Sequence, residues 1–341
     1  MDSVVITRHG GPDVLTLRSS PTPSPGPGEI RIAVRAAGVN FADVLARMGL
    51  YPDAPRPPVV VGYEVAGVVD AVGADVTRFR AGDRVLALTR FGGYATHAIV
   101  PDGFAFPIPA ALTDPEAAAI PVTYLTAAIA LYRMANVAAG ETVLVHGAAG
   151  GVGIAATQLA KLRGAVVIGT ASASKHEAIR RFGVDHAIDY RTADVTAEAR
   201  QITGQRGVDV ILDPLGGRSF RTSYRLLAPM GRMVIYGVSS MAVGEKRSFV
   251  RAIATVLSMR SFWPISLMNH NRGVFGLNVG HLWDQRDQLG GVMNQILADV
   301  TAGRLVPIVA RTFPLDQAAD AHRFVHARQN VGKVVLTVEA R

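Results

Sequence analysis

The sequence predicts an α/β protein with a doubly wound parallel sheet and a second, β-rich domain. Three observations lead to this prediction. Residues 141–164 have the composition of a strand, a tight glycine turn and a helix. From residue 140 to about residue 280, short apolar runs alternate with helical segments, as in sheets whose parallel strands are joined by helices. Residues 1–120 instead hold short strand-like runs separated by Gly, Pro and Asp.

The size and composition fit a globular protein of two domains. The chain has 341 residues, of which 49% are hydrophobic and 18% are charged. The net charge is +8, but the basic residues are scattered along the sequence. This favours a generally basic composition and an anionic cofactor over nucleic-acid binding. The absence of cysteine excludes disulfides, thiolate nucleophiles and cysteine-ligated zinc. No signal-peptide pattern is present and the apolar stretches are too short or interrupted to span a membrane, so we expect a cytoplasmic protein without a transmembrane segment.

The elements of the β-rich region follow from its short apolar runs. We expect strands at 14–17, 29–36, 64–72 and 83–88, and a Pro/Gly-rich loop at 20–29. Residues 40–48 are typical of a short helix that Gly49 ends. Residues 116–135 predict one long apolar helix, although Pro121 lies within it.

The alternating region predicts six strands, at 142–146, 165–169, 186–188, 208–212, 232–236 and 274–277. Their runs are short and apolar, as expected of strands that are covered on both faces. After this region we expect one helix, 285–302, and a last strand, 333–338. Because this tail has no dinucleotide signature, we expect it to fold back onto the first domain.

The glycine turn is the strongest local indication of a ligand. Glycines at such a corner let the backbone turn sharply and approach a pyrophosphate, and the helix that follows offers free N–H groups to the anion. An ordinary strand–helix corner remains the alternative interpretation of the heptad by itself. The residues of this turn that we expect to bind a cofactor are Gly147, Gly150, Gly151, Val152 and Gly153.

The next predicted strand indicates which dinucleotide fits. NAD-binding units usually have Asp or Glu about 20 residues past the glycines, where it binds the ribose 2′-OH. Here that place holds Thr170, Ala171 and Ser172, and Lys175 follows in the same loop. A 2′-phosphate would meet no repulsion there and would gain a hydroxyl donor and a cation. We therefore predict NADPH as the cofactor, while a solvated lysine at a helix start is the alternative for Lys175.

Eight motifs in order resemble one family over the whole chain. The chain is similar to the zinc-free quinone oxidoreductases, the zeta-crystallin-like branch of the medium-chain dehydrogenase/reductases, and most of all to the vesicle amine transport protein homologues. The motifs are AAGVNFADVLARMGLYP (36–52), GYEVAGVV (62–69), AGDRV (81–85), VLVHGAAGGVG (143–153), GTASASKHEA (169–178), DPLGG (213–217), PMGRMVIYG (229–237) and NVGKVVL (330–336).

The resemblance implies a GroES-like β-barrel catalytic domain and a Rossmann domain, with cofactor and substrate in the cleft between them. The catalytic domain would comprise residues 1–121 and 284–341, and the NADPH-binding domain residues 122–283. Similar proteins are homodimers, and the strand near Phe275 to Leu277 would be the joining edge.

The chain departs from the zinc alcohol dehydrogenases at their metal ligands. Asn40 stands where those relatives have a ligand cysteine, and Tyr63 stands where they have a ligand histidine. The loop after Leu88 is short and free of cysteine, and the nine histidines show no metal-ligand spacing. We therefore expect no metal in the site.

The resemblance assigns the reacting region to the segment that follows residue 39. Asn40 and Asp43 are expected to hold waters or the nicotinamide ribose, and Tyr51 to stack on the acceptor or donate to it. Tyr63 is expected to line the substrate pocket. Alternatively, Asn40 and Asp43 cap a helix start, and the two tyrosines are packing residues.

The resemblance also assigns further cofactor contacts. Thr126 matches a position near the cofactor phosphates or nicotinamide, with a core role as the alternative. Tyr190 matches a tyrosine near the adenine and 2′-phosphate, and Arg328 a basic residue that reaches this phosphate, with a surface arginine as the alternative. His146 is interpreted as a buried core histidine. The other expected contacts are Leu215, Gly216, Tyr236, Gly237, Val238, Phe275, Leu277, Asn330 and Lys333.

Three functions remain open on the sequence. The first is an NADPH-dependent, zinc-independent quinone oxidoreductase, in which proximity and orientation carry the catalysis because a quinone is already electrophilic. The second keeps the hydride transfer but takes an enone or enoyl thioester as acceptor. The third is a non-enzymatic NADPH-binding protein associated with lipid surfaces, for which the apolar stretch 247–268 is a candidate contact.

Overall fold

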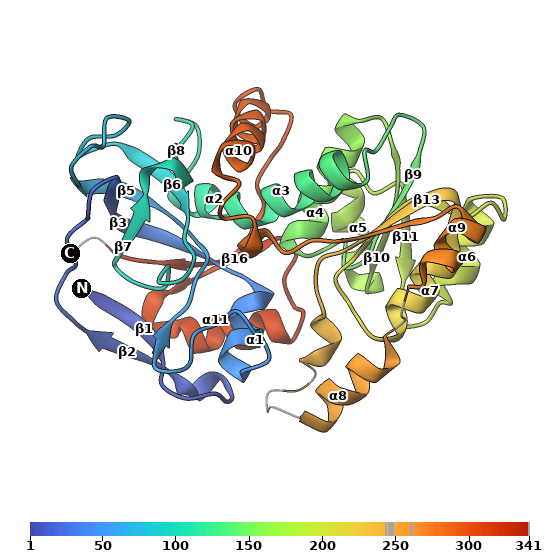
Figure 1. Ribbon diagram of the computed structural model, residues 1–341, viewed down its shortest axis with the longest axis horizontal. Helices are drawn as coiled ribbons and strands as arrows, with labels where there is room; N and C mark the ends of the chain where they lie inside the picture. Colours follow the sequence, from blue (N-terminus) through green and yellow to red (C-terminus); the bar gives the residue numbers. More distant parts are fainter. Residues whose placement is uncertain (243, 245–248, 260–261, 340–341) are drawn as a thin grey trace. The chain divides into compact units, whose positions relative to one another are not determined.

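The computed structural model describes residues 1–242, 244, 249–259 and 262–339 (Figure 1). Residues 247, 248, 260 and 261 of the apolar stretch named above lie outside these described residues. The contacts between residues divide the chain into two units. The first holds Met1–Val122, Ala242 and the residues from Leu282 onward, and the second holds most of the residues between Thr123 and His281.

The second unit contains a six-stranded sheet in which every neighbouring pair is parallel. Its order is β11-β10-β9-β12-β13-β14, so the chain starts in the middle, moves to one edge and then fills the other side. This is the doubly wound order, and it confirms the predicted fold class. The strands are β9 (Thr142–Val145), β10 (Val166–Ala171), β11 (His186–Asp189), β12 (Val208–Asp213), β13 (Leu227–Ile235) and β14 (Gly273–Gly276).

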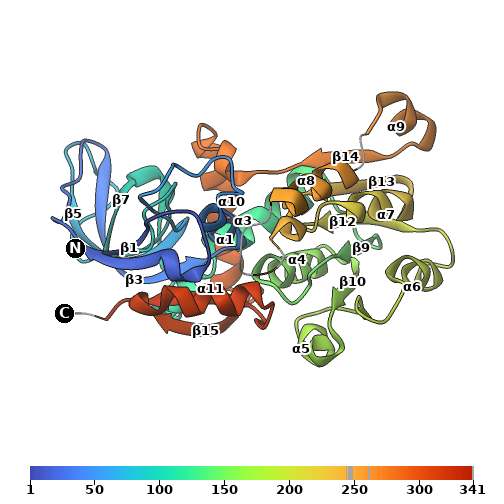
Figure 2. The ribbon, with the colours of Figure 1, turned by 90° about the horizontal axis from the view of Figure 1, so that it is seen from below.

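Helices cover both faces of this sheet. Helix α4 packs on β9 and β10, and helix α7 packs on β12 and β13 (Figure 2). Apolar side chains of the central strands, such as Leu144 and Ile211, are fully buried beneath them. The helices are α4 (Gly151–Leu162), α5 (His176–Arg181), α6 (Val195–Ile202), α7 (Arg218–Leu226), α8 (Phe249–Ser258) and α9 (Pro264–His270).

The strands of the first unit pair antiparallel, except for the parallel pair β15–β16. A three-stranded sheet has the order β2-β1-β4, and a seven-stranded sheet has the order β15-β16-β3-β5-β6-β8, with β7 paired to β3. The strands are β1 (Asp2–Ile6), β2 (Leu15–Ser19), β3 (Glu29–Val39), β4 (Val59–Val60), β5 (Glu64–Val72), β6 (Arg84–Leu88), β7 (His97–Pro101), β8 (Ala105–Pro107), β15 (Val309–Pro314) and β16 (Lys333–Thr337). The helices are α1 (Phe41–Met48), α2 (Asp114–Ala118), α10 (Arg286–Thr301) and α11 (Ala318–His326).

The long helix predicted over 116–135 is wrong in one respect, because the segment is divided. Helix α2 ends at Ala118, α3 (Pro121–Ala128) begins at the proline, and a π-helical turn, Ile129–Met134, continues it. Proline has no N–H to donate and its ring excludes the preceding turn, so Pro121 starts a new helix. None of the helices in the described part of the chain is long and apolar enough to cross a membrane.

Candidate functional site

The glycine turn lies at the carboxyl end of β9 and leads directly into α4. Gly147 has a φ of 66°, a left-handed conformation that favours glycine. Gly150 precedes the first helical residue, and a Cβ on Gly153 would lie 2.4 Å from the carbonyl oxygen of Gly147. The turn is therefore closed against its own helix, and the free N–H groups at the start of α4 form a cradle that fits a dinucleotide pyrophosphate.

The neighbouring strand β10 ends without an acidic residue. Ser172 is 7% exposed, and its hydroxyl lies 3.3 Å from that of Ser174. Lys175 ends the short 3-10 helix Ala173–Lys175 in the same loop. The first carboxylate after the strand, Glu177, pairs with Arg181 on the surface. Strand β10 itself therefore brings no carboxylate to this edge, while Asp189 at the end of the adjacent β11 accepts the Ala173 N–H.

Those other residues expected at the cofactor that follow or end strands of the second unit lie on this same sheet edge, because the strands are parallel, whereas Thr126 lies on a helix. Tyr190 follows β11 and is 39% exposed, while Thr126 on α3 is 7% exposed. Leu277 follows β14, and its N–H donates to the carbonyl oxygen of Ile235 over 2.8 Å. Leu215 and Gly216 follow β12, Tyr236, Gly237 and Val238 follow β13, and Phe275 lies in β14.

In the first unit, Asn40, Glu64 and Lys333 form a closed polar cluster. The Lys333 ammonium lies 2.5 Å from Glu64 Oε1 and 2.5 Å from Asn40 Oδ1. Asn40 Nδ2 donates to Glu64 Oε1 over 2.8 Å, and the Val122 N–H donates to Glu64 Oε2 over 2.7 Å. Glu64 is fully buried and Lys333 is 4% exposed. The ammonium is thus held inside the unit by an anion and an amide oxygen.

Asp43 is the centre of a second buried cluster. Its carboxylate accepts the Asn40 N–H over 2.7 Å, the Gly62 N–H over 3.1 Å and the Tyr94 hydroxyl over 2.9 Å. Burial raises the pKa of Asp43 to about 7, although these three donors and Lys333 act in the other direction. The first of these bonds caps the start of α1.

Tyr94 links Asp43 to a buried histidine. Its hydroxyl lies 3.2 Å from Nε2 of His322. Because the hydroxyl donates to Asp43, it accepts from His322, which therefore carries its proton on Nε2. Burial, the Arg47 charge and His326 hold the pKa of His322 well below its usual range, so the ring is neutral.

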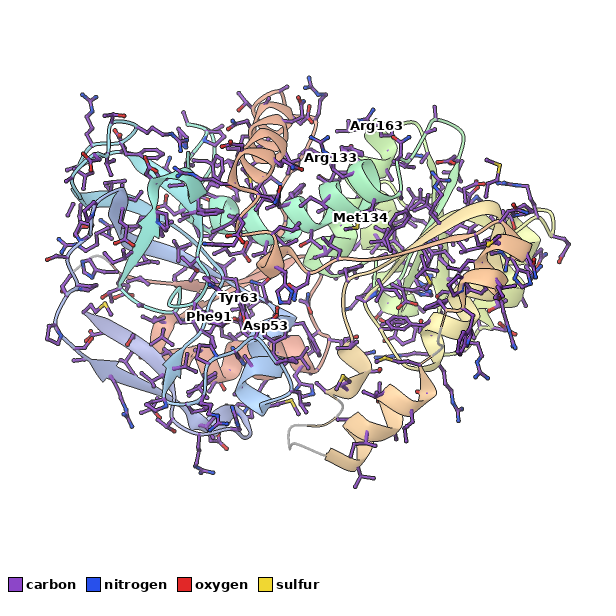
Figure 3. All side chains as sticks on the ribbon, in the orientation of Figure 1. Asp53, Tyr63, Phe91, Arg133, Met134 and Arg163 are labelled. Atoms are coloured by element: carbon purple, nitrogen blue, oxygen red, sulfur yellow. The ribbon has the colours of Figure 1, made fainter. Side chains whose placement is uncertain are left out.

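Three aromatic rings lie together in the same unit. The Tyr63 ring is 6.1 Å from the Tyr51 ring and 5.4 Å from the Phe91 ring, centre to centre. Figure 3 labels Tyr63 and Phe91 together with Asp53, whose charge adds to burial in raising the pKa of Tyr63. Among the described residues, the buried Tyr63 hydroxyl has no hydrogen-bond partner. The raised pKa keeps this phenol protonated.

The remaining two expected residues of the first unit follow α11. Arg328 has a φ of 53°, and Asn330 Nδ2 donates to the carbonyl oxygen of Gly332 over 2.8 Å. Both therefore shape the turn that leads into β16.

The residues at the zinc-ligand positions do not fit a metal. Tyr63 and Asn40 replace nitrogen and sulfur ligands, and the Lys333 ammonium already lies against Asn40 and Glu64. Over the described residues, no group of three or more His, Asp or Glu side chains could hold a metal ion. A zinc ion would have to displace a buried ammonium.

Comparisons with known proteins agree with this architecture. The Alcohol dehydrogenase GroES-like domain family matches residues 26–110, which confirms the expected fold of the first domain, and the Zinc-binding dehydrogenase family matches residues 182–336. The human "Synaptic vesicle membrane protein VAT-1 homolog" is 43% identical over 336 residues, which are 98% of this chain and 85% of that protein.

Two solved structures superpose over nearly the whole chain. The Escherichia coli quinone oxidoreductase complexed with NADPH has a TM-score of 0.87 and 30% identity, over 99% of this chain and 100% of that one. The CurK enoyl reductase has a TM-score of 0.86 and 29% identity, over 99% of both chains.

A chain that combines a doubly wound sheet carrying a glycine turn with a GroES-like unit is a dehydrogenase or reductase of the two-domain kind. The chain belongs to the medium-chain dehydrogenase/reductase superfamily, in the group that contains the VAT-1 homologues.

Several polar residues of these clusters were not among the residues expected from the sequence. Tyr94 and His322 are 228 positions apart, so no local spacing connects them. Asp213, the first residue of the DPLGG motif, is fully buried and was noted only as part of that motif. For Asp213, the sequence offered one signal: an acidic residue at the end of an apolar run and shortly before a pair of glycines.

Proposed function

We propose that the protein is an NADPH-dependent, zinc-independent oxidoreductase that reduces a quinone. The observation that carries the proposal is the carboxyl edge of the parallel sheet, where the glycine turn lies beside the end of β10, and the β10 loop carries Ser172 and Lys175 in place of an acidic residue of its own. The likeness to an NADPH-bound quinone oxidoreductase supports it.

The bound nicotinamide would supply a hydride, and the quinone would take up this hydride and one proton to become a hydroquinone. The residues of the turn, Gly147 to Gly153, would bind the pyrophosphate, and Ser172 and Lys175 would bind the 2′-phosphate. A quinone is electrophilic without a Lewis acid, so the protein has to orient the acceptor and exclude water.

Tyr63 is the group we infer to meet the acceptor oxygen. Its hydroxyl is buried, and no described residue accepts its hydrogen. Because burial and nearby negative charge raise the pKa of this phenol, it would donate a hydrogen bond to a quinone oxygen as negative charge develops there. Tyr51, whose ring lies 6.1 Å away, would pack against the acceptor ring.

An enone or enoyl thioester is the second candidate acceptor. The likeness to an enoyl reductase favours it, and the same phenol could donate a hydrogen bond to the carbonyl oxygen of such an acceptor. A non-enzymatic, lipid-associated function is the third candidate. The exposed apolar side chains Val250, Ile253 and Leu257 on α8 and the name of the human relative favour it.

The test is oxidation of NADPH or NADH by the purified chain with a naphthoquinone, with a crotonyl thioester and without an acceptor. Turnover with NADPH and the quinone is the expected result. Faster turnover of the thioester would select the second candidate. Tight NADPH binding without turnover, together with flotation on liposomes, would select the third.

The cofactor assignment has a sharper test in Lys175. Lys175→Ala is expected to weaken NADPH binding roughly 10- to 100-fold and leave NADH binding unchanged, since a charge-assisted hydrogen bond contributes about 1.5–3 kcal/mol. The matched control is Lys161→Ala, because Lys161 already pairs with Asp185 over 2.8 Å. Equal losses for both dinucleotides would contradict the assignment.

We also infer a homodimer that forms through β14. This strand is the outer strand of its sheet, and Phe275 on it is 37% exposed. Two such strands could pair across a twofold axis and extend the sheet. Sedimentation equilibrium is expected to give twice the mass of the chain, and a monomer at micromolar concentration would contradict the inference.

A further inference from the structure

A continuous series of buried polar side chains crosses the carboxyl edge of the parallel sheet beneath the glycine turn. His146 follows β9 directly and is 7% exposed. Its Nδ1 lies 3.3 Å from Thr170 Oγ1, and its Nε2 lies 3.1 Å from Ser223 Oγ. Ser223 Oγ donates to Asp213 Oδ2 over 2.7 Å. Both ring nitrogens of His146 thus form hydrogen bonds to side chains of the same domain.

The donors available fix the direction of every bond in this series. Ser223 gives its only hydrogen to Asp213, so it must accept from His146, and Nε2 carries the ring proton. Burial lowers the pKa of His146, although Asp213 acts in the other direction, so the ring is neutral and Nδ1 accepts the Thr170 hydroxyl hydrogen. Thr170 Oγ1 is then free to accept the Gly147 N–H over 3.2 Å.

The series ends on a carboxylate that organises another loop. Asp213 Oδ1 accepts the Leu215 N–H over 2.8 Å, and Oδ2 also accepts the Ser219 hydroxyl over 2.7 Å. Leu215 lies in the loop after β12, and Ser219 lies in the first turn of α7. Asp213 therefore sets the position of both the loop and the helix that follows it.

The two ends of the series flank the place where this fold binds ligands. In the order β11-β10-β9-β12-β13-β14, the direction of winding reverses between β9 and β12. Ligands of doubly wound sheets bind outside the carboxyl ends of the strands at this reversal. Gly147 follows β9, Leu215 follows β12, and Thr170 lies in β10, two positions before Ser172.

We propose that His146 is a positioning residue for nucleotide binding, which holds the loops after β9, β10 and β12 in the geometry that NADPH requires. This inference rests on the proposed function for the identity of the nucleotide. Loops that are ordered before binding lose little entropy when the ligand arrives, so the histidine contributes to affinity without touching the ligand. A histidine that only fills the core would contribute to stability alone.

Two variants separate the roles of the ring. His146→Leu keeps the apolar packing and removes both hydrogen bonds, and we expect it to weaken NADPH binding by about tenfold or more. His146→Gln restores an N–H donor toward Ser223 and is expected to recover most of the affinity. Equal affinities for wild type and His146→Leu would overturn the proposal.

The matched control is Thr203→Ala at the opposite end of the sheet. The Thr203 hydroxyl donates to the carbonyl oxygens of Ala199 over 2.8 Å and Arg200 over 3.3 Å and accepts the Gly207 N–H over 3.2 Å, so this variant loses at least as many hydrogen bonds as His146→Leu. It is expected to lower the melting temperature and leave NADPH affinity within about twofold. An equal loss of affinity in the control would mean that the effect of His146 is general destabilisation, which overturns the proposal.

A ligand-free measurement tests the series itself. In the full chain labelled with ¹⁵N-histidine, long-range ¹H–¹⁵N spectra are expected to show His146 neutral and protonated on Nε2 at about pH 5.5, where solvated histidines are charged. A charged ring or an Nδ1–H tautomer would overturn the series. Wild-type protein that keeps this tautomer but binds no NADPH would refute the proposed function instead.

Discussion

Replacing Asp43 by asparagine tests the buried cluster at the start of α1. The carboxylate accepts two backbone N–H groups and one hydroxyl, from Asn40, Gly62 and Tyr94. Asparagine has nearly the same shape, but one of its two acceptor oxygens becomes an NH₂ donor. Because the backbone donors approach different carboxylate oxygens, one of them faces this NH₂ group in either orientation of the amide.

The expected loss of stability follows from these bonds. A buried donor left without an acceptor costs about 1–3 kcal/mol, and a lost helix cap costs about 1 kcal/mol. Asp43→Asn should therefore lower the free energy of unfolding by about 2–4 kcal/mol, a large part of the 5–15 kcal/mol that is usual for a domain.

The loss should also depend on pH. Burial raises the pKa of Asp43 from 3.8 to about 7, so the folded chain keeps a proton that the unfolded chain releases. The stability that this proton provides is fully present below the unfolded pKa and is lost as the pH rises to about 7. Between pH 5 and pH 7 the wild type should lose about 2 kcal/mol through this group. The asparagine variant does not titrate, so its deficit should be larger at pH 5.

Urea unfolding followed by tryptophan fluorescence measures both effects. Trp283 stacks on Phe104 with ring centres 4.0 Å apart and therefore reports on the first unit, and a Trp263→Phe background removes the other tryptophan. The control is Asp70→Asn, which breaks a partly exposed pair with Arg31 and should cost less than about 1 kcal/mol. A deficit of Asp43→Asn that is equal at pH 5 and pH 7 would refute the titration argument, and one below the control would refute the hydrogen-bond argument.

Three further predictions follow from the same structure. Lys333→Met leaves Glu64 as an uncompensated buried charge and should cost about 3–5 kcal/mol in urea unfolding, while adding Glu64→Gln should recover most of this loss. Gly153→Ala places a Cβ 2.4 Å from the Gly147 carbonyl oxygen and should reduce NADPH affinity measured by calorimetry, whereas Gly290→Ala on α10, where a Cβ meets nothing within 4 Å, should leave affinity unchanged and raise the melting temperature. Incubation with a chelator should leave turnover unchanged, and a loss that added zinc restores would contradict the metal-free site.

The parallel sheet was predictable because its strands carry a strong local signal. Strands buried on both faces are continuous apolar runs, so the six expected runs correspond to β9 to β14 with ends that differ by a few residues. The first unit was less predictable. Strands β1, β7 and β15 have mixed burial and were not expected, and their longest apolar runs are only two or three residues. Pro121 divided a segment whose apolar composition alone indicated one helix.

The site was predictable only where it depends on the backbone. The glycine turn is encoded locally, since few residues other than glycine adopt the conformation of Gly147 or fit at Gly153. The polar clusters are not encoded locally. His146 contacts Thr170 and Ser223, 24 and 77 positions away, and only the order of strands in the sheet brings these three side chains together.

In the first unit, a buried carboxylate is paired with a buried ammonium. Glu64 is fully buried, and a buried carboxylate requires a positive partner. Lys333 meets this need at 2.5 Å, and Asn40 binds both groups. Unlike a zinc ion, the Lys333 ammonium cannot bind a substrate carbonyl oxygen as a Lewis acid. The buried carboxylate of Glu64 is therefore compensated by side chains of this unit, as the zinc-independent function proposed above requires.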